Sequence, residues 1–231
     1  MNSCEEWSTE FDLLYQNITS NQAPGLTEYE KSVFLTREQE ADVVMLYKGT
    51  FGDSFEETEE LTHYLSALVR QEECSEEGCN MPHVVTDSQI FLLPDDLLFR
   101  TLEMCKIDVP GCGVKDVVVV PVTQDEYWRT SRNPFKGPNE NKVLRLTYGD
   151  GESFGDSVYR NQYSEIISKY PVVSYSVRYV RRPDPIILVD LAEEGKSING
   201  QTGPKTCALP EFLHQTILTG AVKAAKAAWQ L

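Results

Sequence analysis

The sequence predicts an α+β fold, in which N- and C-terminal helices pack as a bundle against a central antiparallel β-rich region. Apolar residues recur every three or four positions near both ends of the chain, as they do in amphipathic helices. Between them, short apolar runs and alternating apolar and polar residues are typical of strands. We therefore expect three parts: an N-terminal helical region (1–87), a β-rich region (88–205), and a C-terminal helix that packs on the N-terminal helices (206–231).

Several helices are expected in the N-terminal region. Trp7, Phe11 and Tyr15 recur at helical spacing and predict a first helix over residues 8–20. Three further helix starts carry side chains that can cap an N-terminus: Thr27 with Glu30, Thr36, and Ser54 with Glu57. These helices should follow one another with little chain between them.

The clearest strand is expected over residues 172–181. Tyr175, Val177 and Tyr179 fall on one face of an extended chain, and polar side chains lie between them. The strand must end just before Pro183, because proline cannot donate a hydrogen bond to a sheet ladder. Further strands are expected at residues 90–93, 97–107, 117–122 and 142–148.

Two other segments are expected to pack closely. Residues 117–122 form a continuous apolar run, which is typical of a strand buried on both faces, and Thr123 with Glu126 can cap a short helix after it. The last helix starts near Pro210, and its packing face is expected to hold Leu213, Ile217, Ala221, Ala224 and Ala228. Its small side chains serve either internal packing or a subunit contact, for which the candidates are Ala221, Ala224 and Ala225.

Charge is distributed unevenly along the chain. The formal net charge is −15, and residues 1–77 hold 18 acidic and 4 basic side chains, so the remainder is nearly neutral. The acidity of the N-terminal third argues against non-specific binding of that part to nucleic acid or to an anionic membrane. This acidic part is either a solvated face or a face that meets a basic partner, which includes a copy of the same chain. With no secretory signal and no long apolar run, we expect a soluble protein that is made in a cytoplasm and has no membrane partner.

Basic residues of the second half of the sequence form the most distinctive polar feature. They are Arg129, Arg132, Lys136, Lys142 and Arg145, together with Arg178, Arg181 and Arg182. Three uses are open: a solvated sheet edge that discourages strand aggregation, pairing with acidic helices of a neighbouring copy, or contact with nucleic acid.

The sequence lacks the common motifs of catalysis and cofactor binding. It has no phosphate-binding glycine loop, no dinucleotide fingerprint, no nucleophile elbow and no paired-histidine zinc motif. Cys74, Cys79 and His83 are spaced loosely like metal ligands but lack a fourth. The acidic loop 150–156 lacks the register of an EF-hand. We therefore predict no catalytic, cofactor-binding or metal residues, although a hydrolase using buried carboxylates, or a DNA- or protein-binding module using the arginines, stays open as an alternative.

Several stretches of the sequence carry a resemblance to a known family. They are Glu10-Phe11-Asp12-Leu13-Leu14-Tyr15, residues 26–32 (LTEYEKS), Leu35-Thr36, residues 133–139 (NPFKGPN), residues 177–188 (VRYVRRPDPIIL) and residues 207–214 (CALPEFLH). Together they resemble a structural protein of crAss-like tailed bacteriophages. The stretches span nearly the whole chain in order, but none is an active-site motif.

The resemblance implies a non-enzymatic virion component of the neck or tail, similar to the ring-forming head-to-tail adaptors below the portal and made in the host bacterial cytoplasm. It implies a homo-oligomeric ring, of about twelve copies by analogy with adaptors, that contacts the portal and other neck or tail proteins and surrounds passing DNA. The resemblance also implies that the terminal helices pack as a bundle and that a β-rich part lies between them. This agrees with the helix–sheet–helix order expected from the sequence. The candidate subunit-interface residues are then Arg178, Arg181, Arg182, Arg129, Arg132, Ala221, Ala224 and Ala225.

Overall fold

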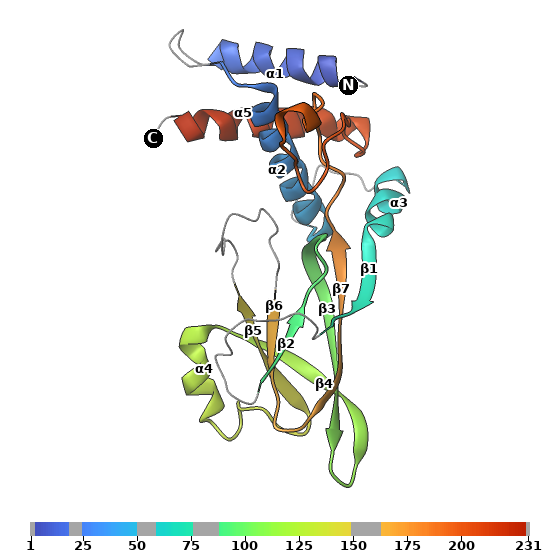
Figure 1. Cartoon of the computed structure of the whole chain (residues 1–231), viewed down its shortest axis with the longest axis vertical. Helices are drawn as coiled ribbons and strands as arrows, with labels where there is room; N and C mark the ends of the chain where they lie inside the picture. Colours follow the sequence, from blue (N-terminus) through green and yellow to red (C-terminus); the bar gives the residue numbers. More distant parts are fainter. Residues whose placement is uncertain (1–2, 19–24, 50–58, 76–87, 149–162, 230–231) are drawn as a thin grey trace. The chain divides into compact units, whose positions relative to one another are not determined.

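Two compact units make up the chain. The structure is a computed structural model, which describes residues 3–18, 25–49, 59–75, 88–148 and 163–229. Unit 1 comprises Met1–Leu68 and Arg182–Leu231, and unit 2 comprises Val69–Arg181 (Figure 1). The segment 182–205, which we expected in the β-rich region, thus belongs with the terminal helices.

Unit 1 is built from helices at both ends of the chain. They are α1 (Cys4–Ile18), α2 (Glu28–Tyr47), α3 (Glu59–Ala67), the short 3-10 helix η1 (Ala192–Glu194) and α5 (Glu211–Trp229). Contacts join α5 to both α1 and α2. No helix in the described part of the chain combines the length and apolar character that a membrane crossing needs.

The start of α2 forms the predicted capping box. Thr27 Oγ1 accepts a hydrogen bond from the Glu30 N–H at 3.3 Å, and Glu30 Oε2 accepts one from the Thr27 N–H at 2.8 Å. The prediction that Thr36 starts another helix is wrong, because Thr36 lies buried inside α2. Its hydroxyl bonds both the C=O and the N–H of Ile186, at 3.3 and 3.1 Å. The hydroxyl thus fixes the returning chain instead of a helix end.

The buried face of α5 differs from the predicted one in its second half. Leu213, Ile217 and Ala221 are fully buried as predicted, but Ala224 and Ala228 are exposed. The buried stripe continues instead through residues on the other side of the helix: Leu218, Val222 and Ala225. A single helical period cannot describe this face, since the stripe turns around the helix axis along its length.

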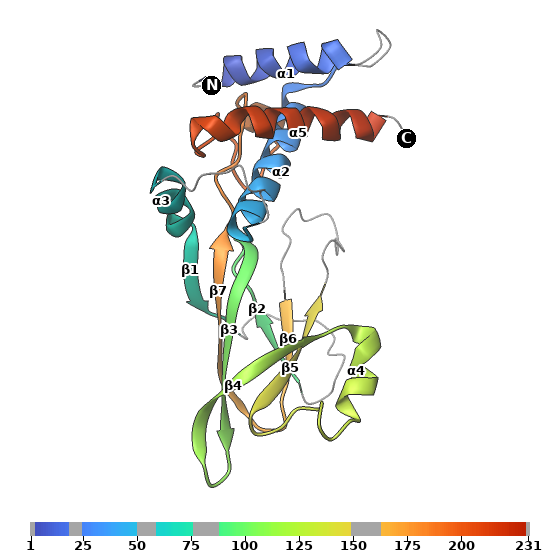
Figure 2. The same cartoon turned by 180° about the vertical axis from the view of Figure 1, so that it is seen from behind.

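Unit 2 is a curled seven-stranded sheet. Its strands are β1 (Val69–Glu73), β2 (Gln89–Leu92), β3 (Leu97–Val109), β4 (Gly113–Val122), β5 (Lys142–Tyr148), β6 (Tyr163–Ile167) and β7 (Val172–Arg181), in the order β1-β7-β3-β4-β5-β6-β2. Val69 lies opposite Val180 where β1 pairs with β7. A bridge between Ser75 and Leu92 links the chain just after β1 to β2, at the other edge of the sheet. The sheet therefore curls far enough for its two edges to meet (Figures 1 and 2).

The sheet is antiparallel except at one pair of strands. β4 pairs with β3 through residues 113–117 and then, in parallel, with β5 through residues 118–122. The connection between the parallel strands includes the short helix α4 (Gln124–Ser131), as a parallel crossover requires. The expected antiparallel β-rich region is thus present, with one parallel pair that the sequence pattern did not predict.

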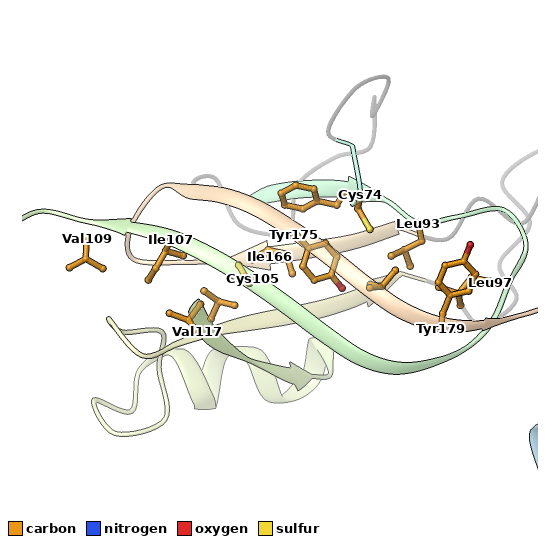
Figure 3. Close-up of a cluster of buried hydrophobic side chains, with 13 residues drawn as sticks. Cys74, Leu93, Leu97, Cys105, Ile107, Val109, Val117, Ile166, Tyr175 and Tyr179 are labelled. Carbon is orange, nitrogen blue, oxygen red and sulfur yellow. The ribbon is translucent and has the colours of Figure 1, made fainter. Parts of the chain in front are cut away.

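The interior of the curled sheet holds the core of unit 2. Tyr175, Val177 and Tyr179 are fully buried, as the alternation in β7 predicts. In Figure 3 the side chains of Cys105, Ile166 and Tyr175 lie together between the surrounding strands. The expectation that residues 117–122 are buried on both faces is wrong, because one face of β4 points away from this core and the Val118 side chain is 65% exposed.

Candidate subunit interface

Two arginines of the predicted basic cluster are used inside the fold. The Nε of Arg145 lies 2.9 Å from Glu103 Oε1 in unit 2, and the Nη1 of Arg182 lies 3.0 Å from Glu40 Oε2 in unit 1. All four side chains are largely buried. Arg145 and Arg182 therefore stabilise the chain itself.

Glu103 is the centre of a buried polar network in unit 2. Its Oε1 also accepts a hydrogen bond from the Tyr175 hydroxyl at 2.5 Å and lies 3.5 Å from Nη1 of Arg100. Burial, and secondly the charge of Arg145, lower the pKa of Arg100. Burial and the Glu103 carboxylate raise the pKa of Tyr175. One carboxylate thus holds two arginines together in a place with little water.

The remaining predicted arginines differ in exposure. Arg178 lies on the face of β7 that points away from the core of unit 2, and its side chain is exposed. It pairs with Gln71 of β1 and with Leu102 of β3. Arg181, the last residue of β7, is partly buried. Arg129 and Arg132 belong to α4 and its C-cap, and both are exposed. Among the arginines of the predicted interface set, Arg178, Arg129 and Arg132 are therefore the ones that a neighbour can reach most directly.

One side of α4 is anchored in the sheet and the other faces solvent. The Thr123 hydroxyl caps α4 by accepting a hydrogen bond from the Glu126 N–H at 3.4 Å. Tyr127 packs against apolar residues of β5 and β6, and α4 stands outside the curled sheet beside β5 in both views (Figures 1 and 2). The next residue, Trp128, is 61% exposed, and the guanidinium of Arg132 lies 5.9 Å from the centre of its ring.

A well-bonded turn after α4 presents Phe135. Asn133 Oδ1 accepts a hydrogen bond from the Phe135 N–H at 2.9 Å, and Lys142 Nζ donates to the Phe135 carbonyl at 2.6 Å. A Cβ at Gly137 would lie 3.0 Å from the Ser131 carbonyl oxygen, so only glycine fits this close approach without displacement. The Phe135 side chain is nevertheless 89% exposed. We call Trp128, Arg129, Arg132, Phe135 and Lys136 the aromatic–basic tip.

Sequence reasoning identified the basic residues of this tip but missed its aromatic ones. The signal was available, because Trp128 and Phe135 are interleaved with four bases between residues 128 and 142, against one acid. Large aromatic side chains beside arginine are typical of the residues that dominate protein–protein interfaces.

The small residues of α5 divide between the interior and the surface. Ala221 and Ala225 are fully buried within unit 1, whereas Ala224 is exposed. Gly220 has a separate role, because a Cβ there would overlap the carboxyl group of Glu38 on α2. The missing side chain thus makes room for Glu38. A groove of about 540 Å³ lies between α2 and α5. Its lining residues are Glu38, Asp42, Met45, Gln215, Thr216, Thr219, Gly220 and Lys223, and we call it the α2–α5 groove.

Asp42 is an unusual wall residue for such a groove. Its side chain is fully buried, and neither carboxylate oxygen has a hydrogen-bond partner. Burial, together with the nearby charge of Glu38, raises the pKa of Asp42 to about 7. Burial also raises the pKa of Glu38, while the charge of Lys223 acts in the opposite direction. The groove thus holds negative charge that the described residues do not fully compensate.

Two motifs considered as metal sites cannot be placed. Cys79, His83 and the loop 150–156 lie outside the described residues, as does the predicted cap at Ser54. In the ranges that the structure does describe, no three metal-ligating side chains come together.

Comparison with known proteins decides the family. A sequence profile for the phage tail ring protein 3/4 family matches residues 1–231. The chain belongs to this family. It is 38% identical over 227 residues to Ring protein 3 of Bacteroides phage crAss001, which covers 96% of this chain and 94% of that protein. It is also 33% identical over 232 residues to Ring protein 4/5 of the same phage, covering 97% and 92%.

Membership in this ring protein family confirms the resemblance drawn from the scattered stretches. The match covers the whole chain, including both units and the segments between strands. The relatives are named as ring proteins, which indicates a structural rather than a catalytic part for the family. The surfaces of the two units, more than any reactive side chain, are therefore where its function should be sought.

Proposed function

We propose that this chain is a structural subunit of an oligomeric ring in the phage neck, where it acts as a head-to-tail adaptor below the portal. The observation that carries the proposal is the nearly complete alignment with two proteins that are both named ring proteins. In this position the ring provides a conduit for DNA and a platform for the tail. The net charge of −15 suits a lumen through which DNA moves, because phosphate groups are not attracted to it.

The ring closes by heterologous contacts, in which each copy offers one surface to a different surface of the next. The acidic side comes from unit 1, whose helix α1 holds Glu5, Glu6, Glu10 and Asp12 and no lysine or arginine. The basic side comes from unit 2, through the exposed Arg129, Arg132 and Arg178. Charge complementarity of this kind sets register and partner choice more than affinity.

Reversing the three exposed arginines together should abolish assembly without unfolding the subunit. We expect the triple variant of Arg129, Arg132 and Arg178 to glutamate to stay monomeric under conditions in which the unmodified chain forms rings, because like charges then meet at each contact. Analytical ultracentrifugation measures the oligomer, and circular dichroism checks the fold. The matched control reverses three exposed bases elsewhere: Arg37, Lys106 and Lys205. Rings that survive the first triple variant would contradict charge pairing at these residues.

Imaging of purified particles tests the function itself. We expect a closed ring of this chain at the joint between head and tail, with copies related by rotation about the tail axis and with DNA or an open channel at its centre. A single copy per particle, or a location away from the neck and tail, would refute the proposal.

A further inference from the structure

We propose that the aromatic–basic tip of one copy docks in the α2–α5 groove of a second copy, with Phe135 inside the groove and a basic side chain of the tip facing Glu38 and Asp42. This inference rests on the proposed ring and specifies the contact that closes it.

The groove needs a cation that its own subunit does not supply. Buried polar groups in folded proteins almost always have a hydrogen-bond partner, and a buried carboxylate without one calls for an explanation. Asp42 has no such partner, and Glu38 lies one helical turn before it on the same wall. Lys223 is the only basic side chain among the lining residues, so the two carboxylates outnumber it. A lysine or arginine from outside would restore the balance.

The tip has the properties of a preformed anchor. Phe135 is held by hydrogen bonds from both sides of its backbone, so little conformational entropy is lost when it binds. The Phe135 side chain buries little of its surface within its own subunit. Lys136 follows it directly, and Arg132 lies over the Trp128 ring nearby. An apolar anchor flanked by positive charge matches a concave site that contains Met45 and two carboxylates.

A second copy is the occupant that best agrees with these observations. Every copy carries one tip in unit 2 and one groove in unit 1, so tip-to-groove contacts can repeat head-to-tail from copy to copy around a ring. The charges are complementary, because the segment 128–142 has an excess of three positive charges in a strongly acidic chain. One contact of this kind thus accounts for both the exposed aromatic side chain and the unpartnered carboxylate.

Coupling lysine amines directly to carboxylates in purified particles tests the contact in its native setting. A reagent that joins the two groups without a spacer should link Lys136 to Glu38, in multimeric bands of this chain and not in the monomer band. Peptide mass spectrometry locates the link. Other links between copies without this one, or links from Lys136 to a different segment or protein, would overturn the inference and leave the ring intact. Particles in which this chain forms no links between copies would instead count against the proposed function.

A charge exchange within the full recombinant chain provides the second test. Lys136→Glu and Glu38→Lys should each weaken self-association about tenfold or more, and the two together in one chain should restore most of it. Phe212→Ala is the control for loss of an exposed aromatic side chain and should leave self-association unchanged. Losses that merely add in the double variant would contradict the contact.

Asp42→Asn separates a docking role from a structural one. Removing a buried, uncompensated charge should raise the thermal stability of the isolated subunit, while it weakens self-association because a partner for the tip is lost. A residue that only supports the fold would move both quantities in the same direction. A variant that assembles as well as the unmodified chain would overturn the role of Asp42 in docking.

Discussion

Replacing Glu103 with glutamine should lower the free energy of unfolding by about 3–5 kcal/mol, the usual cost of breaking a buried ion pair by removing one partner. The Glu103 carboxylate holds Arg145 and Arg100 inside the curled sheet and accepts the hydroxyl of Tyr175. Without its charge, two buried guanidinium groups repel one another with no compensating anion. Urea unfolding followed by circular dichroism measures the loss, and hydrogen exchange of the β3 and β7 amides should locate it in unit 2.

The ion pair of Glu194 with Lys196 provides the matched control. Its N–O distance is 2.8 Å, close to that of the buried pair, but both side chains are about half exposed. Glu194→Gln should therefore leave the free energy of unfolding nearly unchanged, as is usual for exposed surface pairs. Equal losses for the two variants would show that burial does not set the strength of the Glu103 network.

Replacing Asp42 with asparagine should stabilise unit 1 at pH 8 and do much less at pH 4. The pKa of Asp42 is raised from 3.8 to about 7 in the folded chain, so the folded state binds a proton that the unfolded state has released between these values. The stability contributed by protonated Asp42 is therefore fully present below about pH 4 and is lost as the pH rises to about 7. Over that range the unmodified chain should lose about 2–4 kcal/mol relative to the variant.

Thermal or urea unfolding of both chains at several pH values measures this difference. Asp95→Asn, at an exposed aspartate, is the control and should shift stability equally at each pH. A stability difference between Asp42→Asn and the unmodified chain that stays constant from pH 4 to pH 8 would mean that Asp42 is ionised normally in the folded state.

The sequence predicted correctly those helix and strand ends that depend on residues only a few positions away. The capping box at Thr27 depends on residues three positions apart, and the end of β7 depends on the proline that follows, so both could be found without a structure. Thr36 looked like a cap for the same reason, but its partner is Ile186, 150 positions later in the chain. No local pattern reports such a partner, which is why one long helix was predicted as two.

The candidate interface was predicted with the same limits. Basic residues could be counted, but a sequence does not show which of them meet a buried carboxylate. Arg145 and Arg182 do so through Glu103 and Glu40, which lie 42 and 142 positions away. The parallel pairing of β4 with β5 was not predicted for a related reason. β4 pairs with β3 along its first half and with β5 along its second half, and the sequence does not show this change of partner strand. The exposure of Phe135 likewise depends on a turn whose bonds come from both sides of it.

The pairing of Val69 with Val180 has a consequence for how this protein can be altered. Unit 2 is a single stretch of chain, and its first residue pairs in the sheet with its last residue but one. Unit 2 is therefore connected to the rest of the chain in the way that an inserted domain is, with the start and the end of the insertion next to one another. Such a module can be excised and replaced by a short linker, or transplanted between relatives, with little disturbance to the ends that it leaves behind.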